Sequence, residues 1–287
     1  MANTSTTTVA VLGTGIIGAA VARNLRKQGF VVRAWNRTAQ KAQALEASDV
    51  QVFGTAQEAV KGAHIVLTSL KDGPAVREAL DAAAPALSKG ATWIQLSTVG
   101  IDANEALAAL ARQHGLGFYD APVQGTRQPA EQGQLVVLAS GPLEGRAVVQ
   151  PVFDAIGKRT LWVSEQAGDS SRLKLALNSW AFALTHGIAE SLAIAKGLGV
   201  DPALVVDVVK GGPMDSGYFQ LKAAAILADD YTTSFSVANA VKDSQLVVDA
   251  ARGAGVKVDA AAAGLERFRR ARDAGHGDKD MAASYLA

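Results

Sequence analysis

Residues 9–18 read VAVLGTGIIG, a short apolar run that leads directly into three glycines spaced as G-x-G-x-x-G. The apolar run predicts a buried strand, and residues 16–28 predict a helix that Gly29 ends. A glycine-rich turn between a strand and a helix lets backbone N–H groups approach a pyrophosphate at the helix N-terminus. We therefore expect this stretch to bind a dinucleotide cofactor. The expected cofactor-binding residues of the turn are Gly13, Thr14, Gly15, Ile16 and Ile17.

The alternation of apolar runs and helical stretches continues through the first half of the chain. Further apolar runs occur at residues 30–35, 64–68, 92–96, 117–120 and 135–139. Strands that are apolar throughout are typical of a parallel sheet buried under helices on both faces. Residues 1–164 are therefore predicted to form an α/β Rossmann domain with a mostly parallel sheet.

From about Asp169 the strand pattern stops and the sequence is typical of helices. Residues 169–196 predict one helix of about 28 residues, which is about 42 Å long. Further helices are predicted at residues 201–211, 236–252, 259–274 and 280–286. Residues 165–287 are thus expected to form an all-α domain, joined to the first domain by the long helix.

Composition limits the classes of partner. The 287 residues include 28 Lys+Arg and 27 Asp+Glu, so a net charge of +1 predicts no basic surface for nucleic acid. The first eight residues lack the pattern of a signal peptide, and no apolar run is long enough to span a membrane. We therefore expect a cytoplasmic protein that binds neither nucleic acid nor membrane. Cysteine is absent and the four histidines are dispersed, so no metal site is expected.

The end of the second predicted strand indicates which dinucleotide binds. NAD sites usually place a carboxylate here, whereas residues 35–38 read WNRT. Arg37 can pair with a 2′-phosphate, and Asn36 and Thr38 add hydrogen-bonding groups. We therefore expect NADP(H), with a merely solvated Arg37 as the alternative.

Several segments, in the same order along the chain, resemble the β-hydroxyacid dehydrogenase family. This family includes 3-hydroxyisobutyrate dehydrogenases and glyoxylate or semialdehyde reductases, and imine reductases share its architecture. The resemblance covers essentially the whole chain. Its motifs are the glycine turn at residues 13–18, Ser97-Thr98, the loop DAPVQGT at residues 120–126, Lys174 and Asn178 in K-x-x-x-N spacing, and Phe235-Ser236 followed by Lys242-Asp243.

The resemblance implies a substrate and dimerisation role for residues 165–287, a homodimer or homotetramer, and roles for particular residues. It makes Lys174 the general acid or base and lets Asn178 hydrogen-bond the substrate. The four-residue spacing independently places both on one helix face among apolar neighbours, where a lysine that only extends to solvent is the alternative. The other implied substrate-binding residues are Ser97, Val123, Gln124, Gly125 and Thr126. The other implied cofactor-binding residues are Ser69, Leu70, Ser97, Thr98 and Lys242.

The chain also departs from the family pattern. Gln124 replaces the usual Ser, Thr126 replaces a Gly, and Gln95 replaces an Asp before the Ser-Thr pair. Because a β-branched residue disfavours positive φ, we expect a loop of altered shape at Thr126.

These observations leave three functions open. The leading one is NADPH-dependent reduction of a small aldehyde or keto acid. The second is NADPH-dependent imine reduction, against which Lys174 stands, because dedicated imine reductases usually carry Asp or Tyr there. The third, from another class, is an NADP-binding sensor without turnover.

Overall fold

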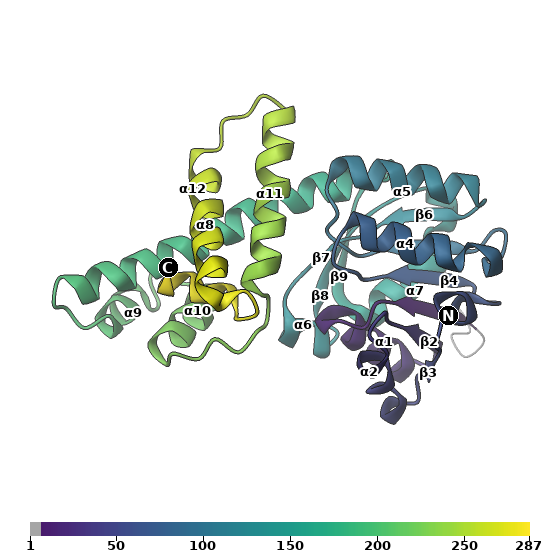
Figure 1. Ribbon diagram of the computed structural model, residues 1–287, viewed down its shortest axis with the longest axis horizontal. Helices are drawn as coiled ribbons and strands as arrows, with labels where there is room; N and C mark the ends of the chain where they lie inside the picture. The colour runs from purple at the N-terminus through teal and green to yellow at the C-terminus, as the bar shows by residue number, and fades with distance from the viewer. Residues whose placement is uncertain (1–6) are drawn as a thin grey trace. The chain divides into compact units, whose positions relative to one another are not determined.

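The computed structural model describes residues 7–287. Residues 1–6, which belong to the segment predicted above not to be a signal peptide, lie outside the described residues. The chain divides into two compact units between Lys174 and Leu175, here called unit 1 and unit 2 (Figure 1). Both are described separately below. No helix among the described residues is long and apolar enough to cross a membrane.

The strands of unit 1 form one nine-stranded sheet within the described part of the chain. They are β1 (Thr8–Leu12), β2 (Val31–Trp35), β3 (Gln51–Val52), β4 (Ile65–Thr68), β5 (Thr92–Gln95), β6 (Gly117–Asp120), β7 (Val123–Gln124), β8 (Leu135–Ser140) and β9 (Gly157–Ser164). Their spatial order is β3-β2-β1-β4-β5-β6-β8-β7, with β9 beside β8. All pairs from β3 to β6 are parallel, whereas β8 is antiparallel to β6 and β7. The prediction of a mostly parallel sheet is confirmed.

Helices cover both faces of this sheet (Figure 1). One group consists of α1 (Ile16–Lys27), α6 (Arg127–Glu131) and α7 (Arg146–Ile156). The other consists of α3 (Ala56–Val60), α4 (Gly73–Ala83) and α5 (Ile101–Gln113), while the short α2 (Ala39–Gln43) follows β2.

The central strand β1 shows why its sequence is apolar throughout. Val9 and Val11 pack into the core that includes α1, whereas Ala10 and Leu12 pack into the core that includes α3 and α4. All four side chains are fully buried. Because alternate residues of a strand point to opposite faces, a strand covered on both sides needs apolar residues at every position.

Unit 2 is helical, as predicted. The helix α8 (Asp169–Gly197) has 29 residues, begins in unit 1 and continues into unit 2. The remaining elements are α9 (Ala203–Val209), α10 (Gly217–Leu227), α11 (Val237–Gly253), α12 (Asp259–Ala271), a π-helical turn (Arg272–His276) and a 3₁₀ segment (Met281–Leu286). Their shared core contains Phe182, Leu192 and Phe268.

No helix is predicted from the sequence at residues 213–235, where the structure has α10. Its sequence GYFQLKAAAIL is apolar around most of its circumference, so it lacks the one-sided pattern that identifies an amphipathic helix. The signal that remains is Ser216, whose side chain caps the helix by accepting from the Phe219 N–H.

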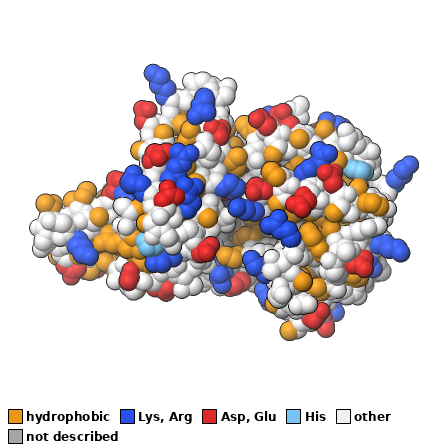
Figure 2. All heavy atoms as spheres, viewed as in Figure 1, with side chains coloured by type: hydrophobic (Ala, Val, Ile, Leu, Met, Phe, Trp, Pro, Cys, Tyr) orange, Lys and Arg blue, Asp and Glu red, His pale blue; other side chains and the backbone are white. Residues whose placement is uncertain are grey.

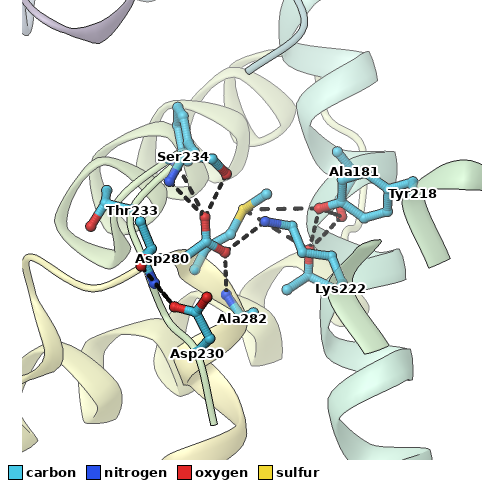
Figure 3. A network of polar contacts seen from close by, with 12 residues as sticks. Ala181, Tyr218, Lys222, Asp230, Thr233, Ser234, Asp280 and Ala282 are labelled. Carbon is cyan, nitrogen blue, oxygen red and sulfur yellow. Dashed lines mark hydrogen bonds and ion pairs between the residues drawn. The ribbon is translucent and has the colours of Figure 1, made fainter. Parts of the chain in front are cut away.

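A buried ion pair fixes the end of the chain in unit 2 (Figure 3). The Lys222 Nζ donates to the Asp280 carboxylate at 2.6 Å, and both side chains are almost fully buried. The same carboxylate accepts hydrogen bonds from the backbone N–H groups of Ser234, Phe235 and Ala282. Burial alone would raise the pKa of Asp280, but Lys222, the Ser234 hydroxyl and the Ala282 N–H hold the pKa below its ordinary value.

Candidate active site

The glycine turn after β1 has a shape that only glycine allows at two positions. Gly13 has φ +99°, and a Cβ there would lie 2.3 Å from the Ser69 carbonyl oxygen. A Cβ on Gly18 would lie 2.0 Å from the Gly13 carbonyl oxygen. Helix α1 therefore packs tightly onto the turn, and its N-cap Gly15 offers no side-chain acceptor to the first N–H groups. Such an N-terminus suits a phosphate.

The end of β2 is tied to this turn by Asn36. Its Oδ1 accepts from the Thr14 N–H at 3.0 Å, and its Nδ2 donates to the Thr38 carbonyl at 3.0 Å. The Thr14 Oγ1 is buried with no hydrogen-bond partner within the described residues, so a bound ligand would satisfy it. These residues fit a dinucleotide bound across the turn.

Arg37 extends from the end of β2 into solvent. Its side chain is 79% exposed, and its guanidinium lies 3.9 Å from the Glu78 carboxylate. An exposed pair at this distance contributes little to stability, so the guanidinium is available to a ligand phosphate.

Ser97, after β5, is held by a neutral hydrogen-bond network. The Gln95 Oε1 accepts from the Ser97 N–H at 2.6 Å, and the Gln95 Nε2 donates to the Ser97 carbonyl at 2.7 Å. The Ser97 Oγ in turn accepts from the Leu70 N–H at 2.8 Å, which links the segments after β4 and β5. Gln95 is fully buried. Gln95 is predicted above only to depart from the family pattern, although a glutamine inside an apolar strand is itself a signal of a buried hydrogen-bond network.

The loop after β6 is connected to the start of α8 by Asp120. Its carboxylate accepts from the Ser171 N–H at 2.8 Å and from the Ser171 hydroxyl at 2.9 Å. Burial outweighs these hydrogen bonds and raises the pKa of Asp120 to about 6. Because Lys174 follows Ser171 by about one helical turn, Asp120 fixes the segment that carries the candidate proton donor.

Lys174 points at the same loop. Its Nζ donates to the Gln124 Oε1 at 2.8 Å, and the residue is 8% exposed. Within unit 1 the structure thus brings Lys174 and Gln124 together, beside the buried Val123.

The loop is less strained at Thr126 than the sequence predicts. Gly125 takes the positive φ, +130°, and a Cβ there would lie 2.8 Å from the Leu135 side chain. Thr126 has φ −115° and is the N-cap residue of α6. The prediction of an altered loop at Thr126 is therefore wrong, because Thr126 does not take a positive φ and extended backbone suits threonine.

In unit 2, Asp243 joins two of the predicted residues. Its Oδ2 accepts from the Asn178 Nδ2 at 3.0 Å, and its Oδ1 lies 2.5 Å from the Lys242 Nζ. Asn178 and Asp243 are both buried. Because a carboxylate accepts only, the Asn178 amide must turn its NH₂ group to Asp243 and its oxygen elsewhere. No role for Asp243 is predicted from the sequence, since its partner Asn178 lies 65 residues away.

Comparison with known proteins identifies the family. Residues 8–164 match the family model described as the NAD binding domain of 6-phosphogluconate dehydrogenase. Residues 168–287 match a second family model, described as NAD-binding of NADP-dependent 3-hydroxyisobutyrate dehydrogenase. The chain belongs to the β-hydroxyacid dehydrogenase family. This β-hydroxyacid dehydrogenase family member is an NAD(P)-dependent oxidoreductase, as the sequence predicts.

Individual relatives support this family assignment. Glyoxylate/succinic semialdehyde reductase 1 from Arabidopsis thaliana is 30% identical over 278 residues, which cover 96% of each chain. The solved 3-hydroxyisobutyrate dehydrogenase from Salmonella typhimurium is 26% identical with a TM-score of 0.91, over 98% of this chain and 99% of that one. An imine reductase from Pseudomonas sp. is 24% identical with a TM-score of 0.64, over 98% of both chains, and shares the fold.

Proposed function

We propose that this protein reduces a small aldehyde or keto acid with NADPH, and that Lys174 donates the proton. The observation that carries the proposal is the nearly buried Lys174 ammonium directed at the Gln124 amide in the loop after β6. The similarity to a glyoxylate/succinic semialdehyde reductase supports the substrate class.

Some residues of unit 1 are assigned to cofactor binding and Lys174 to proton transfer. Bound NADPH supplies the hydride for the carbonyl carbon. The N-terminus of α1, Thr14 and Asn36 would hold its phosphates and ribose, and Ser97 would lie beside the reacting end. As negative charge develops on the carbonyl oxygen, the Lys174 ammonium stabilises it and passes a proton to it, which completes the alcohol. In the reverse direction a neutral lysine takes the hydroxyl proton.

Asn178 and Lys242 act together in this proposal. Asp243 orients the Asn178 amide and neutralises part of the Lys242 charge, so the amide oxygen is presented in one direction. We assign Asn178 to a substrate hydrogen bond, Lys242 to the cofactor, and Asp243 to positioning both.

NADPH rather than NADH is the proposed cofactor. Asn36 occupies the position at which an NAD site usually places a carboxylate, and it is used to hold the glycine turn. Arg37 is exposed beside it and only weakly paired with Glu78. A 2′-phosphate therefore meets a guanidinium, and the residue after β2 that usually repels it in an NAD site is the uncharged Asn36.

A homodimer or homotetramer is also proposed, from an exposed apolar area of unit 2. Hydrophobic side chains gather where α8 ends and α9 follows (Figure 2). The most exposed are Ile194, Leu198, Leu204 and Val208. Contiguous apolar surface of this kind typically marks a protein–protein contact. Light scattering after size-exclusion chromatography should give a multiple of the chain mass, and Leu198→Glu should lower it.

The function is tested by NADPH oxidation with glyoxylate, succinic semialdehyde and a cyclic imine, using wild type beside Lys174→Met. We expect turnover of an aldehyde acid and a loss of about 10²- to 10⁴-fold in kcat in the variant. Lys89→Met, at an exposed position, is the matched control. Imine turnover alone would replace this proposal with imine reduction, and NADPH binding without any turnover would favour a sensor.

A further inference from the structure

The first turn of α8 is held by two neighbouring strands of the sheet. The last residue of β6, Asp120, lies opposite the last residue of β8, Ser140, and both side chains are fully buried. The Ser140 Oγ accepts from the Ser170 N–H at 3.3 Å. The Asp120 Oδ2 accepts from the Ser171 N–H at 2.8 Å. Because the first N–H groups of a helix have no partner within the helix, β6 and β8 supply acceptors that α8 needs.

Both oxygens of Asp120 act as acceptors toward Ser171. Oδ2 receives the backbone N–H, and Oδ1 receives the Ser171 hydroxyl at 2.9 Å. An ionised carboxylate only accepts, whereas a protonated carboxyl group must also donate a proton. The negative charge also lies at the N-terminus of a 29-residue helix, where an anion is favourable. Protonation of Asp120 removes the charge and turns one acceptor into a donor, so the contact with Ser171 weakens.

The position of Lys174 depends on this contact. Lys174 follows Ser171 by three residues, so the two lie on one face of α8, about 4.5 Å apart along the helix axis. The Lys174 Nζ donates to the Gln124 Oε1 at 2.8 Å, in the loop that begins at Asp120. Asp120 therefore fixes both the helix that carries the ammonium and the loop that the ammonium contacts. A displacement of about 1 Å between them corresponds to a loss of about 100-fold in rate.

The surroundings of Asp120 disfavour its charged form. Burial outweighs the hydrogen bonds and the nearby Arg172, and raises the pKa of Asp120 to about 6. The Arg172 guanidinium is itself paired with Asp169 of α8 and Glu105 of α5, and Lys174 is the next cation along the helix. The strands β5 and β8 place uncharged residues opposite Asp120. A neutral side chain would occupy this place at a lower cost in stability, so the charge itself needs another explanation.

We propose that Asp120 is a positioning residue: its ionised carboxylate fixes the first turn of α8 so that Lys174 meets the substrate, and its protonation slows proton transfer. The inference rests on the proposed function and adds a pH dependence to it. As the pH falls, a proton donor becomes more protonated, so Lys174 alone gives no loss of activity on the acid side. Loss of the Asp120 charge does give one, and kcat/KM should rise with pH through about 6.

The experiment measures kcat/KM for glyoxylate from pH 5 to 8 in wild type and Asp120→Asn, with NADPH saturating. Asparagine keeps the shape and one acceptor and removes the charge. At pH 8 we expect Asp120→Asn to be about 10-fold slower than wild type, and its profile should lack the rise near pH 6. The 2′-phosphate of NADPH also titrates near pH 6, but it is common to both proteins. Asp102→Asn, at an exposed position of α5, is the matched control and should keep the wild-type profile.

Thermal unfolding at pH 8 separates positioning from a merely structural role. Because Asp120→Asn removes a buried charge, its unfolding midpoint should equal or exceed that of wild type while its activity is lower. A midpoint that falls together with the activity overturns the proposal. An unchanged pH profile in Asp120→Asn also overturns it, and leaves the proposed function intact.

Hydrogen exchange tests Asp120 without any turnover. At pH 8 the amides of residues 168–175 should exchange faster in Asp120→Asn than in wild type, whereas those of α4 should exchange at equal rates. If wild type reduces no substrate, the proposed function fails, and this measurement still decides whether the Asp120 charge holds the first turn of α8. Equal exchange of residues 168–175 in the two proteins overturns the assignment of Asp120.

Discussion

Each unit contains a nearly buried lysine, and the two lysines donate to different groups. In unit 1 Lys174 donates to the amide oxygen of Gln124, and a second amide, that of Gln95, holds Ser97. In unit 2 Lys222 donates to the carboxylate of Asp280. A carboxylate neutralises a lysine and fixes it, whereas an amide positions its partner without cancelling charge or repelling an anion. The partner therefore distinguishes Lys222, which stabilises the fold, from Lys174, which is placed for the proposed chemistry.

Loss of Lys222 should give the largest change in stability. Lys222→Met leaves the buried Asp280 carboxylate without its cation, so we expect the free energy of unfolding to fall by about 3–5 kcal/mol. Urea unfolding measures this. Lys174→Met, by contrast, should cost turnover and little stability. The double variant Lys222→Met/Asp280→Asn removes the buried charge and keeps an oxygen that accepts from the backbone N–H groups, so it should recover part of the loss. A single-variant loss below about 1 kcal/mol would remove the distinction between the two lysines.

The contributions of the two units to stability should depend on pH in opposite directions. Burial, with Arg267 nearby, lowers the pKa of His186 in unit 2 to about 4. The His186 imidazole therefore takes up a proton more readily in the unfolded chain than in the folded protein. The His186 contribution is present above pH about 6.5 and is lost as the pH falls towards 4, by about 3 kcal/mol at about 1.4 kcal/mol per pKa unit.

Asp120 in unit 1 should act in the opposite direction. Its pKa is raised on folding to about 6, so its contribution is present below pH about 4 and is lost as the pH rises through 6. Urea unfolding at several pH values from 4 to 7 should show a shallower acid loss for His186→Leu than for wild type. Asp120→Asn should show a steeper one. Parallel pH profiles for all three proteins would contradict both assignments.

The amide network of Gln95 should contribute a smaller amount. Gln95→Met deprives the Ser97 N–H and carbonyl of their buried partners, and we expect a loss of about 2 kcal/mol in the free energy of unfolding. Because Ser97 then moves, kcat/KM should also fall, by about 10-fold. Paired unfolding and kinetic measurements check this. A stability loss with unchanged kinetics would show that Gln95 supports the sheet alone.

The smallest effect is expected at the exposed Arg37. Arg37→Ser removes the guanidinium at the end of β2, and we expect the ratio of kcat/KM for NADPH to that for NADH to fall about 10-fold. Initial rates with each cofactor give the ratio. Lys41→Ser, an exposed change in the neighbouring α2, should not alter it. An unchanged ratio in Arg37→Ser would mean that the 2′-phosphate is recognised elsewhere.

The sequence predicts those parts of the molecule that depend on local pattern. The glycine turn, the apolar strand β1 and the long α8 each follow from residues that are close together in the chain. The partners Asp243 and Asp120 could not be predicted in the same way, because they lie 65 residues from Asn178 and 51 from Ser171. The conformation of Thr126 depends on Gly125 taking the strained φ, which a single sequence does not reveal.

Asp280 is synthesised after most of its partners, and this order affects how the chain folds during synthesis. Its partners Lys222 and Phe235 precede it by 58 and 45 residues, so they are made well before the carboxylate that joins them. The last strand of unit 1 ends at Ser164, and all nine strands are available while much of unit 2 is still being translated. We therefore expect unit 1 to fold on the ribosome before unit 2 closes, because unit 2 closes only once residue 280 has been made. A ribosome that stops before residue 280 would leave a formed sheet attached to an open helical unit, which is a substrate for proteases.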